Sequence, residues 1–266
     1  MSLIALAADK GAPGVTTAAT VLAAVWPRPA LLAECDPAGG DLAYRLPGDD
    51  GAALNPAKGL LSLGATARRG LAPQQVHEHT QRLIGGLEVL VGINGAEQAT
   101  GLSWLWEPLG LALANMPGLD VVADCGRVGS YPPIHDLMAE ASMIVLFTRP
   151  HLDQVAHMRE RYVALQRALA ERGRRVPIGV VVIAPQKEYA RSLGEVRRVM
   201  AAVGQPDAVV GGLAFDVKGA DLLRGEWGGR LERSLLVRSA RELAGNLAAR
   251  IAAEARSGPT VAGRGT

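Results

Sequence analysis

Residues 3–17 read LIALAADKGAPGVTT, and this stretch decides the fold. Leu3 to Ala8 is an apolar run of strand length, a loop rich in glycine and proline follows, and a helical pattern runs from about Thr16 to Val25. A glycine-rich turn that feeds a helix N-terminus presents free N–H groups and the positive end of the helix dipole. The stretch therefore predicts a strand, a loop suited to a phosphate group, and a helix.

The rest of the chain alternates short apolar runs with longer helical patterns. The expected strands are Leu3–Ala8, Ala30–Glu34, Leu87–Ile93, Leu119–Ala123, Met143–Thr148, Ile178–Ile183 and Ala208–Leu213, and the clearest helices are Leu152–Arg172 and Lys187–Val203. The strands lack apolar–polar alternation, which is typical of strands covered on both faces. We predict an α/β fold with a mostly parallel central sheet flanked by helices on both faces. Residues 1–256 are expected to form one domain, and 257–266 a flexible tail.

The expected strand ends indicate where a ligand would bind. In a parallel sheet, ligands bind beyond the carboxyl ends of the strands. Those ends read Asp9-Lys10-Gly11, Cys35-Asp36-Pro37, Asp124-Cys125-Gly126, Thr148-Arg149-Pro150, Ala184-Pro185-Gln186 and Ala214-Phe215-Asp216. Aspartates at this edge are suited to a metal or phosphate site.

The composition excludes several classes of protein. Hydrophobic residues make up 48% and charged residues 20% of the 266 residues, so the chain is not disordered. Two cysteines, Cys35 and Cys125, exclude a disulfide scaffold and a cysteine-rich zinc module, and both are expected to be buried and reduced. A net charge of +2 is too small to predict nucleic-acid binding by itself. Lysine is scarce, which draws attention to Lys10.

No targeting or membrane segment is visible in the sequence. The start, MSLIALAADKG, has no basic region before its apolar run, and that run ends at Asp9 and Lys10. No uncharged apolar stretch reaches the roughly 18 residues of a membrane span. We expect a cytoplasmic protein.

The loop after the first expected strand resembles the phosphate loop of the ParA/MinD family of deviant-Walker ATPases, K-G-G-x-G-K-T-T. Lys10, Gly11, Gly14, Thr16 and Thr17 match that pattern. Ala12 replaces a glycine, and Val15 stands where the family has its phosphate-binding lysine. The order of the motifs and the strand–helix alternation resemble the family over roughly residues 1–250, which implies a P-loop NTPase fold of the ParA/MinD type.

Two later segments carry the same resemblance. Residues 31–41, LLAECDPAGGD, look like the family's switch I, with Glu34 in place of its first aspartate and Asp36 matching the second. Residues 120–126, DVVADCG, look like the Walker B strand, with Asp124 as its terminal acid. In the family the second switch I aspartate lies near the magnesium ion and the attacking water, so the resemblance implies a catalytic role for Asp36 if the site is active.

The resemblance implies ATP and Mg²⁺ as cofactors, and a set of residues for each. Nucleotide binding would fall to Lys10, Gly11, Gly14, Val15, Thr16, Thr17, Asp124 and Gln186, and metal binding to Thr16, Asp36 and Asp124. Gln186 follows the strand where related proteins carry an adenine-side Asn, and a surface glutamine is the alternative interpretation. Losing the charge-assisted contact at Val15 costs about 1.5–3 kcal/mol, or one to two decades of affinity. We therefore expect weak or absent ATP binding and negligible hydrolysis.

Lys10 matches the family's signature lysine, which reaches the partner's phosphates across a dimer; a solvated residue at the strand end is the alternative. The resemblance implies a positioning or assembly protein with a degenerate nucleotide site, which acts by dimerisation and by binding an unknown protein partner. Its setting would be chromosome partitioning or a Tad-type pilus or secretion system, at a peripheral or polar position. The alternative is a functional but weak Mg-ATPase that drives a partitioning cycle on DNA or membrane. Arginine-over-lysine usage and the PGVTT loop resemble actinobacterial forms.

Three further features have structural interpretations. His77 and His79 lie two apart on an expected helix, so shared zinc ligation is not expected. Of Trp104 and Trp106 one should face the core, and Trp227 offers an exposed anchor.

The segment Leu231–Arg256 predicts a basic amphipathic helix, which either docks on the sheet or lies on an anionic membrane. We expect it to dock, because it has no aromatic residue. The absence of G-x-G-x-x-G argues against an unrelated dinucleotide-binding enzyme.

Overall fold

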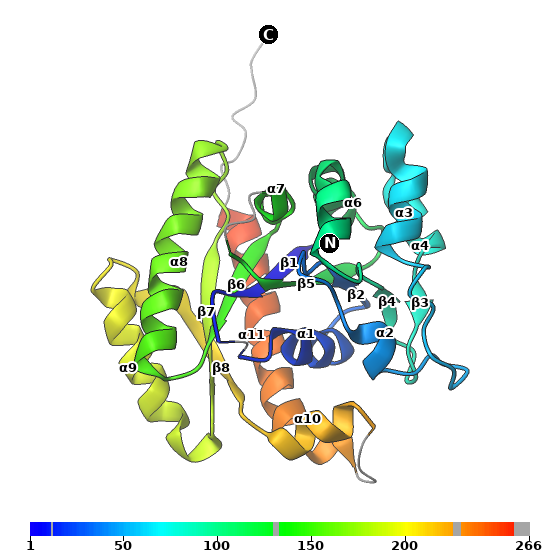
Figure 1. Ribbon diagram of the computed structural model, residues 1–266. Coiled ribbons are helices and arrows are strands. Elements are labelled where there is room, and N and C mark those ends of the chain that lie inside the picture. The colour runs from blue at the N-terminus through cyan, green and yellow to red at the C-terminus, as the bar shows by residue number, and fades with distance from the viewer. Residues whose placement is uncertain (12, 130–132, 226–229, 258–266) are drawn as a thin grey trace.

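The computed structural model describes residues 1–11, 13–129, 133–225 and 230–257 (Figure 1). Its strands form one sheet of eight, in the order β3-β4-β2-β5-β1-β6-β7-β8. Neighbouring strands pair in parallel except β3, which runs antiparallel to β4. The strands are β1 Leu3–Ala8, β2 Ala30–Glu34, β3 Gln81–Arg82, β4 Glu88–Leu90, β5 Asp120–Arg127, β6 Met143–Thr148, β7 Ile178–Ala184 and β8 Val209–Ala214. The predicted mostly parallel sheet is confirmed.

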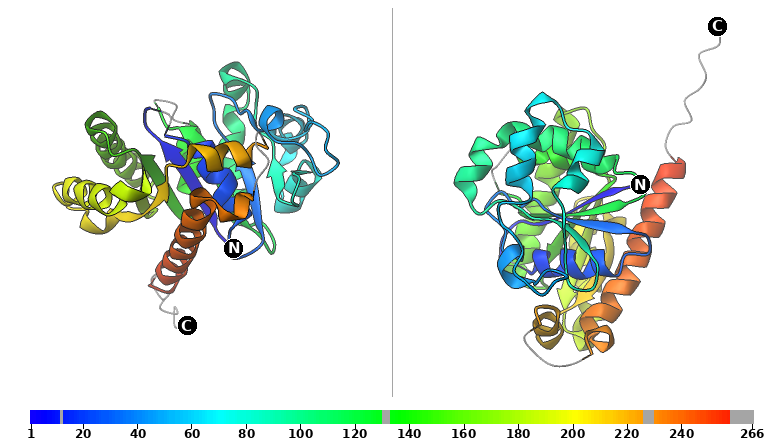
Figure 2. Two further views of the ribbon diagram at one scale, coloured as in Figure 1. Left: turned by 90° about the horizontal axis from the view of Figure 1, so that it is seen from below. Right: turned by 90° about the vertical axis from the view of Figure 1, so that its right-hand side faces the viewer.

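Helices cover both faces of this sheet, as predicted. The α-helices are α1 Val15–Ala24, α2 Leu42–Arg45, α3 Leu60–Thr66, α4 Pro73–Glu78, α5 Ala96–Gly101, α6 Trp106–Ala114, α7 Pro133–Ala139, α8 Leu152–Glu171, α9 Tyr189–Ala201, α10 Val217–Leu223 and α11 Leu235–Ser257. Short 3₁₀ turns occupy Ala67–Arg69, Ser103–Leu105, Gln186–Glu188, Pro206–Ala208 and Leu231–Arg233. Figure 2 shows α1 and α11 on one side of the sheet and the helices from α3 to α8 on the other.

The strand β1 shows why the strands lack a polar side. Leu3, Ala5 and Ala7 belong to an apolar cluster with α6, α7 and α8, whereas Ile4, Leu6 and Ala8 belong to a second cluster with α1 and α11. Successive side chains of a strand point to opposite faces, so a sheet covered on both faces needs apolar residues at every position. All six residues of β1 are accordingly buried.

Strands β4 and β5 differ from their predicted bounds by more than one residue at an end. Residues 120–127 form β5, so Asp124, Cys125 and Gly126 lie inside a strand that was expected to end at Ala123. The strand continues because it pairs with β2 as far as Asp124 and with β1 as far as Arg127, and its register with β1 shifts near Gly126. Conversely, β4 is shorter than the predicted Leu87–Ile93, since the Gly92 amide donates to the Glu34 carboxylate instead of to a strand.

The C-terminal segment was predicted as one helix, Leu231–Arg256, but it consists of a 3₁₀ turn and α11. Ser234 between them has extended backbone, and its hydroxyl accepts a hydrogen bond from the Val237 amide at 3.1 Å, which caps the new helix. The predicted docking is confirmed: Leu243 and Leu247 are buried against the sheet in the cluster with α1. No helix in the described ranges is long and apolar enough to cross a membrane. Of the expected tail, Ser257 is the last residue of α11, and 258–266 lie outside the described residues.

Candidate functional site

The loop between β1 and α1 stands at the carboxyl edge of the sheet, between the ends of the neighbouring strands β5 and β6. Gly11 has φ +80° and Gly14 has φ +108°, in the left-handed region that only glycine adopts readily. Gly14 is the N-cap of α1 and makes no side-chain hydrogen bond to the first turn, which carries no acidic residue. The first-turn amides and the positive end of the helix dipole therefore face the loop without a side-chain acceptor.

Val15 is the first residue of α1, and it has no polar group to offer a ligand. It is only 6% exposed and packs in the apolar cluster with Ala18 and Leu22 of the same helix. Val15 therefore contributes to the core and offers no charge to a phosphate group.

An acidic pair lies beside the loop, formed by Asp36 after β2 and Asp124 within β5. Asp124 is 1% exposed; its Oδ1 accepts a hydrogen bond from the Gly126 amide at 3.0 Å, and its buried Oδ2 has no hydrogen-bond partner. Burial raises the pKa of Asp124 to about 6, while the Thr16 side chain and the Gly126 amide lower it and the charge of Asp36 raises it further. Burial also raises the pKa of Asp36, whose Oδ1 accepts from the Ala38 amide at 2.8 Å.

Gly126 sets the distance between the two acids. A Cβ at this position would lie 1.9 Å from Oδ2 of Asp36, and its φ of +58° is a left-handed conformation. Any side chain here would push Asp36 away from Asp124. The sequence placed Gly126 at a strand end but gave it no role, because that role depends on a contact with a residue 90 positions away.

Glu34, which replaces the first switch I aspartate, has a structural role in this chain. Its two carboxylate oxygens accept hydrogen bonds from the Leu42 and Gly92 amides, each at 2.9 Å. A Cβ on Gly40 would lie 2.0 Å from its carboxylate carbon, so the loop after β2 closes directly over this side chain. Burial raises the pKa of Glu34. Glu34 therefore fixes the loop that carries Asp36.

The remaining site residues of the prediction lie in different surroundings. Lys10 and Gly11 are exposed, and the side chain of Gln154 on α8 lies over Gly11. Thr16 and Thr17 are partly buried in the first turn of α1. Gln186 is exposed in the 3₁₀ turn after β7 and does not line the cavity beside Gly14. The structure brings the loop, Asp36 and Asp124 together and leaves Gln186 apart.

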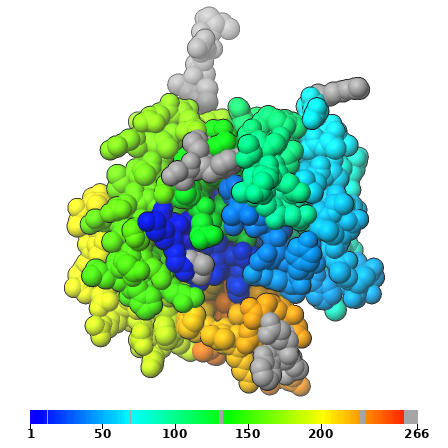
Figure 3. Space-filling view, in the orientation of Figure 1, coloured from blue at the N-terminus to red at the C-terminus, as the bar shows by residue number. Residues whose placement is uncertain are grey.

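That cavity has a volume of about 160 Å³ and adjoins the loop on the side away from the acids. Gly14 and Thr17 line it, together with Arg149 after β6 and Phe215 after β8. The Arg149 guanidinium carbon lies 4.7 Å from the centre of the Phe215 ring. Figure 3 shows the dark-blue surface of the loop at the centre of this face, with the orange surface of α10 below it. Arg149 and Phe215 stand at strand ends that the sequence analysis named, but the sequence assigned neither of them a role.

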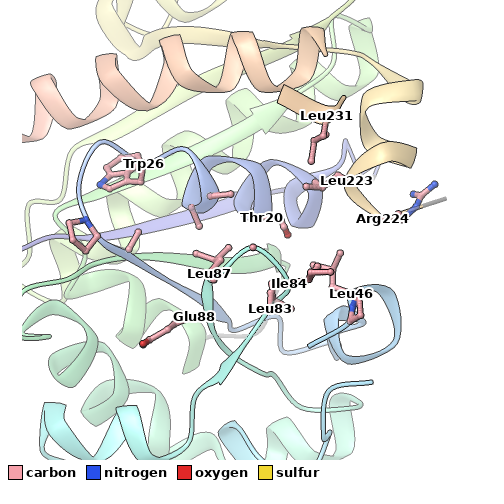
Figure 4. Close-up of a pocket in the computed structure, with 18 of the residues that line it drawn as sticks. Thr20, Trp26, Leu46, Leu83, Ile84, Leu87, Glu88, Leu223, Arg224 and Leu231 are labelled. Atoms are coloured by element: carbon pink, nitrogen blue, oxygen red, sulfur yellow. The ribbon is translucent and has the colours of Figure 1, made fainter. Parts of the chain in front are cut away.

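A second, larger cavity of about 820 Å³ is separate from the loop. It lies between α1, the β3–β4 hairpin and α10, and it is mostly apolar (Figure 4). Leu83, Ile84 and Leu87 of the hairpin face Thr20 of α1 across it. None of its lining residues is one of the predicted site residues.

The other predicted features are accounted for structurally. His77 lies 3.4 Å from Glu88, whereas His79 bonds to Ser62, so the two imidazoles do not converge. Cys35 and Cys125 are both buried, and burial raises the pKa of each thiol. As expected of two tryptophans so spaced, Trp106 is buried and Trp104 is exposed. Trp227 lies outside the described residues.

The residues present fit a magnesium ion and a phosphate group in part. Within the described ranges no three His, Cys, Asp or Glu side chains are grouped to hold a metal. Mg²⁺ needs no such cage, since it is commonly bound by one or two carboxylates, waters and substrate phosphates. The unpartnered Oδ2 of Asp124, with Asp36 and Thr16 beside it, suits that mode. The phosphate side keeps the backbone but lacks the lysine.

The sequence matches no family model and no curated protein. Solved structures do share its fold. The ParA family ATPase of Chlorobium tepidum matches with a TM-score of 0.71 and 15% identity over 91% of this chain and 98% of that one. The McdA(D38A)–ATP complex of Cyanothece matches with a TM-score of 0.68 and 14% identity over 93% and 96%. MinD in the MinC:MinD cell division complex of Aquifex aeolicus matches with a TM-score of 0.63 and 13% identity over 94% and 96%. The chain therefore has the fold of the ParA/MinD ATPases.

Proposed function

We propose that this protein is a ParA/MinD-like positioning or assembly protein with a degenerate nucleotide site, which acts by dimerisation and by binding a partner. The carrying observation is Val15, a core residue at the head of α1 in a loop that otherwise keeps its glycines and first-turn threonines. ATP and Mg²⁺ are bound weakly or not at all, because no lysine neutralises the phosphates at this position. When bound, the nucleotide would supply a phosphate chain between the loop amides and the acidic pair.

Dimerisation through the edge that carries the loop is supported by exposed apolar side chains there. Leu152, at the start of α8, is 88% exposed, and Phe215 and Val217 beside the smaller cavity are 41% and 58% exposed. All three follow carboxyl ends of strands, as does Lys10. Large apolar side chains that gather around a site on one edge are typical of an interaction surface.

Sedimentation velocity tests this proposal. The full chain should form a dimer with or without Mg-ATP, and Leu152→Glu should weaken it by placing a charge in the interface. Leu111→Glu is the matched control, because Leu111 is 44% exposed on α6 and lies away from this edge. A chain that stays monomeric at high concentration contradicts the proposal, and so does equal weakening by the two variants.

The second candidate is a weak Mg-ATPase, and the unpartnered Oδ2 of Asp124 favours it. A buried carboxylate oxygen without a donor is disfavoured unless a cation or a proton occupies it in use. Phosphate release from Mg-ATP distinguishes the candidates. Turnover that disappears in Asp36→Ala supports the ATPase, whereas a rate at the level of buffer supports the degenerate site.

The cellular setting follows from what the site and the charge allow. A protein partner is the first expectation, since the MinC:MinD complex is a structural neighbour. The net charge of +2 gives no support to DNA binding. The apolar side of α11 packs on the sheet, so it does not support membrane binding either. The corresponding proposal is a cytoplasmic protein of the actinobacterial type, at a peripheral or polar position. It would act in chromosome partitioning or in a pilus or secretion machine. Fluorescence localisation and the partners that co-purify with the tagged chain test it.

A further inference from the structure

We propose that Arg149 binds a phosphate group at the loop between β1 and α1, as the positive charge that replaces the lysine lost at Val15. The inference rests on the function proposed above, because that function assigns a phosphate ligand to the loop. It concerns a residue outside the phosphate loop, the switch I segment and the Walker B strand, in which the family resemblance was found.

The topology brings Arg149 to the loop. Arg149 follows Thr148, the last residue of β6, and β6 pairs in parallel with β1. The carboxyl ends of two such neighbouring strands lie side by side, so Arg149 and the loop share one edge of the sheet. Arg149 lines the cavity of about 160 Å³ together with Gly14 and Thr17. The side chain thus reaches the first turn of α1, where the loop presents its amides.

The guanidinium group is held in place and has an unused donor. Its central carbon lies 4.7 Å from the centre of the Phe215 ring, a cation–π contact that holds the group beside this ring. Its Nε is buried and has no hydrogen-bond partner among the described residues. Buried donors in folded proteins are nearly always paired, so this Nε is open to an acceptor that the described residues do not supply.

The two acids that line this cavity with Arg149 are engaged elsewhere. Asp216 accepts hydrogen bonds from the Gly219 amide at 2.9 Å and from the Leu236 amide at 3.1 Å. Asp221 pairs with Arg224. Both acids line the cavity, but Asp216 accepts from helix amides and Asp221 forms an ion pair with a neighbouring arginine. Arg149 therefore keeps its charge for a ligand.

Phosphate is the ligand class that these groups recognise together. A guanidinium donates two parallel hydrogen bonds to a phosphate, and helix N-terminal amides add further donors from the other side. A phosphate also brings three strong acceptor oxygens, so it can use the guanidinium and the amides at the same time.

Isothermal titration of the full chain with pyrophosphate, ADP and ATP, each with Mg²⁺, tests the inference. Arg149→Gln should weaken binding about 10- to 100-fold, because it keeps donors but removes the charge. Arg149→Lys should recover part of the loss. Arg191→Gln is the matched control, since Arg191 is 83% exposed on α9, and it should bind as the unchanged chain does.

The three ligands separate the sources of the phosphate. Binding of pyrophosphate with the same loss in Arg149→Gln identifies the phosphate itself, whereas binding of ADP and ATP alone with that loss identifies a nucleotide. Equal affinity of Arg149→Gln and the unchanged chain overturns the inference, provided that thermal unfolding shows both to be folded. Absence of binding in the unchanged chain also overturns it, but leaves the dimerising role standing, because sedimentation measures that role without a ligand.

Discussion

The acidic side of the candidate site and its phosphate side differ in what they keep. On the acidic side, Asp124 is buried with an unpartnered oxygen, and Gly126 leaves room for Asp36 beside it. On the phosphate side, the glycine loop keeps its shape, but Val15 is part of the core. Buried carboxylates of this kind are disfavoured unless they serve a ligand, whereas a valine in a core stabilises the fold. The difference is the one that a degenerate nucleotide site, as proposed above, would have: an acidic side open to a ligand beside a phosphate side without a lysine.

Gly126→Ala breaks the acidic side most severely. The new Cβ would lie 1.9 Å from the Asp36 carboxylate in a left-handed conformation, so the free energy of unfolding should fall by about 3–5 kcal/mol. Gly118→Ala is the control: its φ is +73°, but its Cβ would meet nothing within 4 Å. Urea unfolding measures both. Similar losses in the two variants contradict the close approach of Asp36.

Asp124→Asn removes the buried charge. The pKa of Asp124 is raised from 3.8 to about 6, so the folded protein favours the protonated carboxyl and its ionisation opposes folding. The free energy of unfolding therefore falls as the pH rises from about 4 to about 6. Without Mg²⁺, Asp124→Asn should gain about 2–3 kcal/mol relative to the unchanged chain between pH 4 and pH 8. Unfolding free energies across this range test it. Parallel pH profiles of the two proteins mean that Asp124 does not titrate as described.

Val15→Lys restores the missing side chain on the phosphate side. Affinity for Mg-ATP should rise by about 1.5–2 kcal/mol, because a charge-assisted contact returns. The melting temperature should fall, since Val15 is a core residue. Val15→Ile, which keeps the position apolar, controls for a change of packing. A variant that gains no affinity shows that the loop has lost more than its lysine.

Lys10→Ala addresses the charge that a partner subunit would supply. Lys10 is exposed beside the loop, and its removal should weaken the dimer by about 1 kcal/mol if it reaches a charged group of the other copy. Arg175→Ala removes an exposed charge from the loop before β7, at the opposite edge of the sheet, and should leave the dimer unchanged. Sedimentation equilibrium compares them. Equal dimer constants for Lys10→Ala and the unchanged chain assign Lys10 to the solvated surface.

The sequence predicts the central strands well, because apolar runs bounded by glycine, proline or charge have few alternatives. Strands β1, β2 and β6 begin and end where they were expected. The edge hairpin of β3 and β4 was missed, since β3 has two residues and no apolar run. The end of β5 was placed too early, because an aspartate indicates a strand end unless its burial is known. The burial of Asp124 cannot be deduced from strand propensity, because it results from the pairing of β5 with β1 and β2.

The candidate site divides in the same way. Motif spacing is a local property, and it pointed to Gly14, Asp36 and Asp124. Arg149 over Phe215 is a contact between strand ends 66 positions apart, and neither residue belongs to a local pattern. The structural role of Glu34 likewise depends on the Gly92 amide from β4 and on the absence of a side chain at Gly40.

Calorimetric titration of the unchanged full chain with Mg-ATP, with phosphate release followed in the same preparation, tests the central claim most directly. Because Val15 lies in the core and offers no charge to the phosphates, we expect a dissociation constant well above micromolar and no turnover beyond that of buffer. Submicromolar binding, or turnover comparable to that of an ordinary ParA/MinD ATPase, would contradict it.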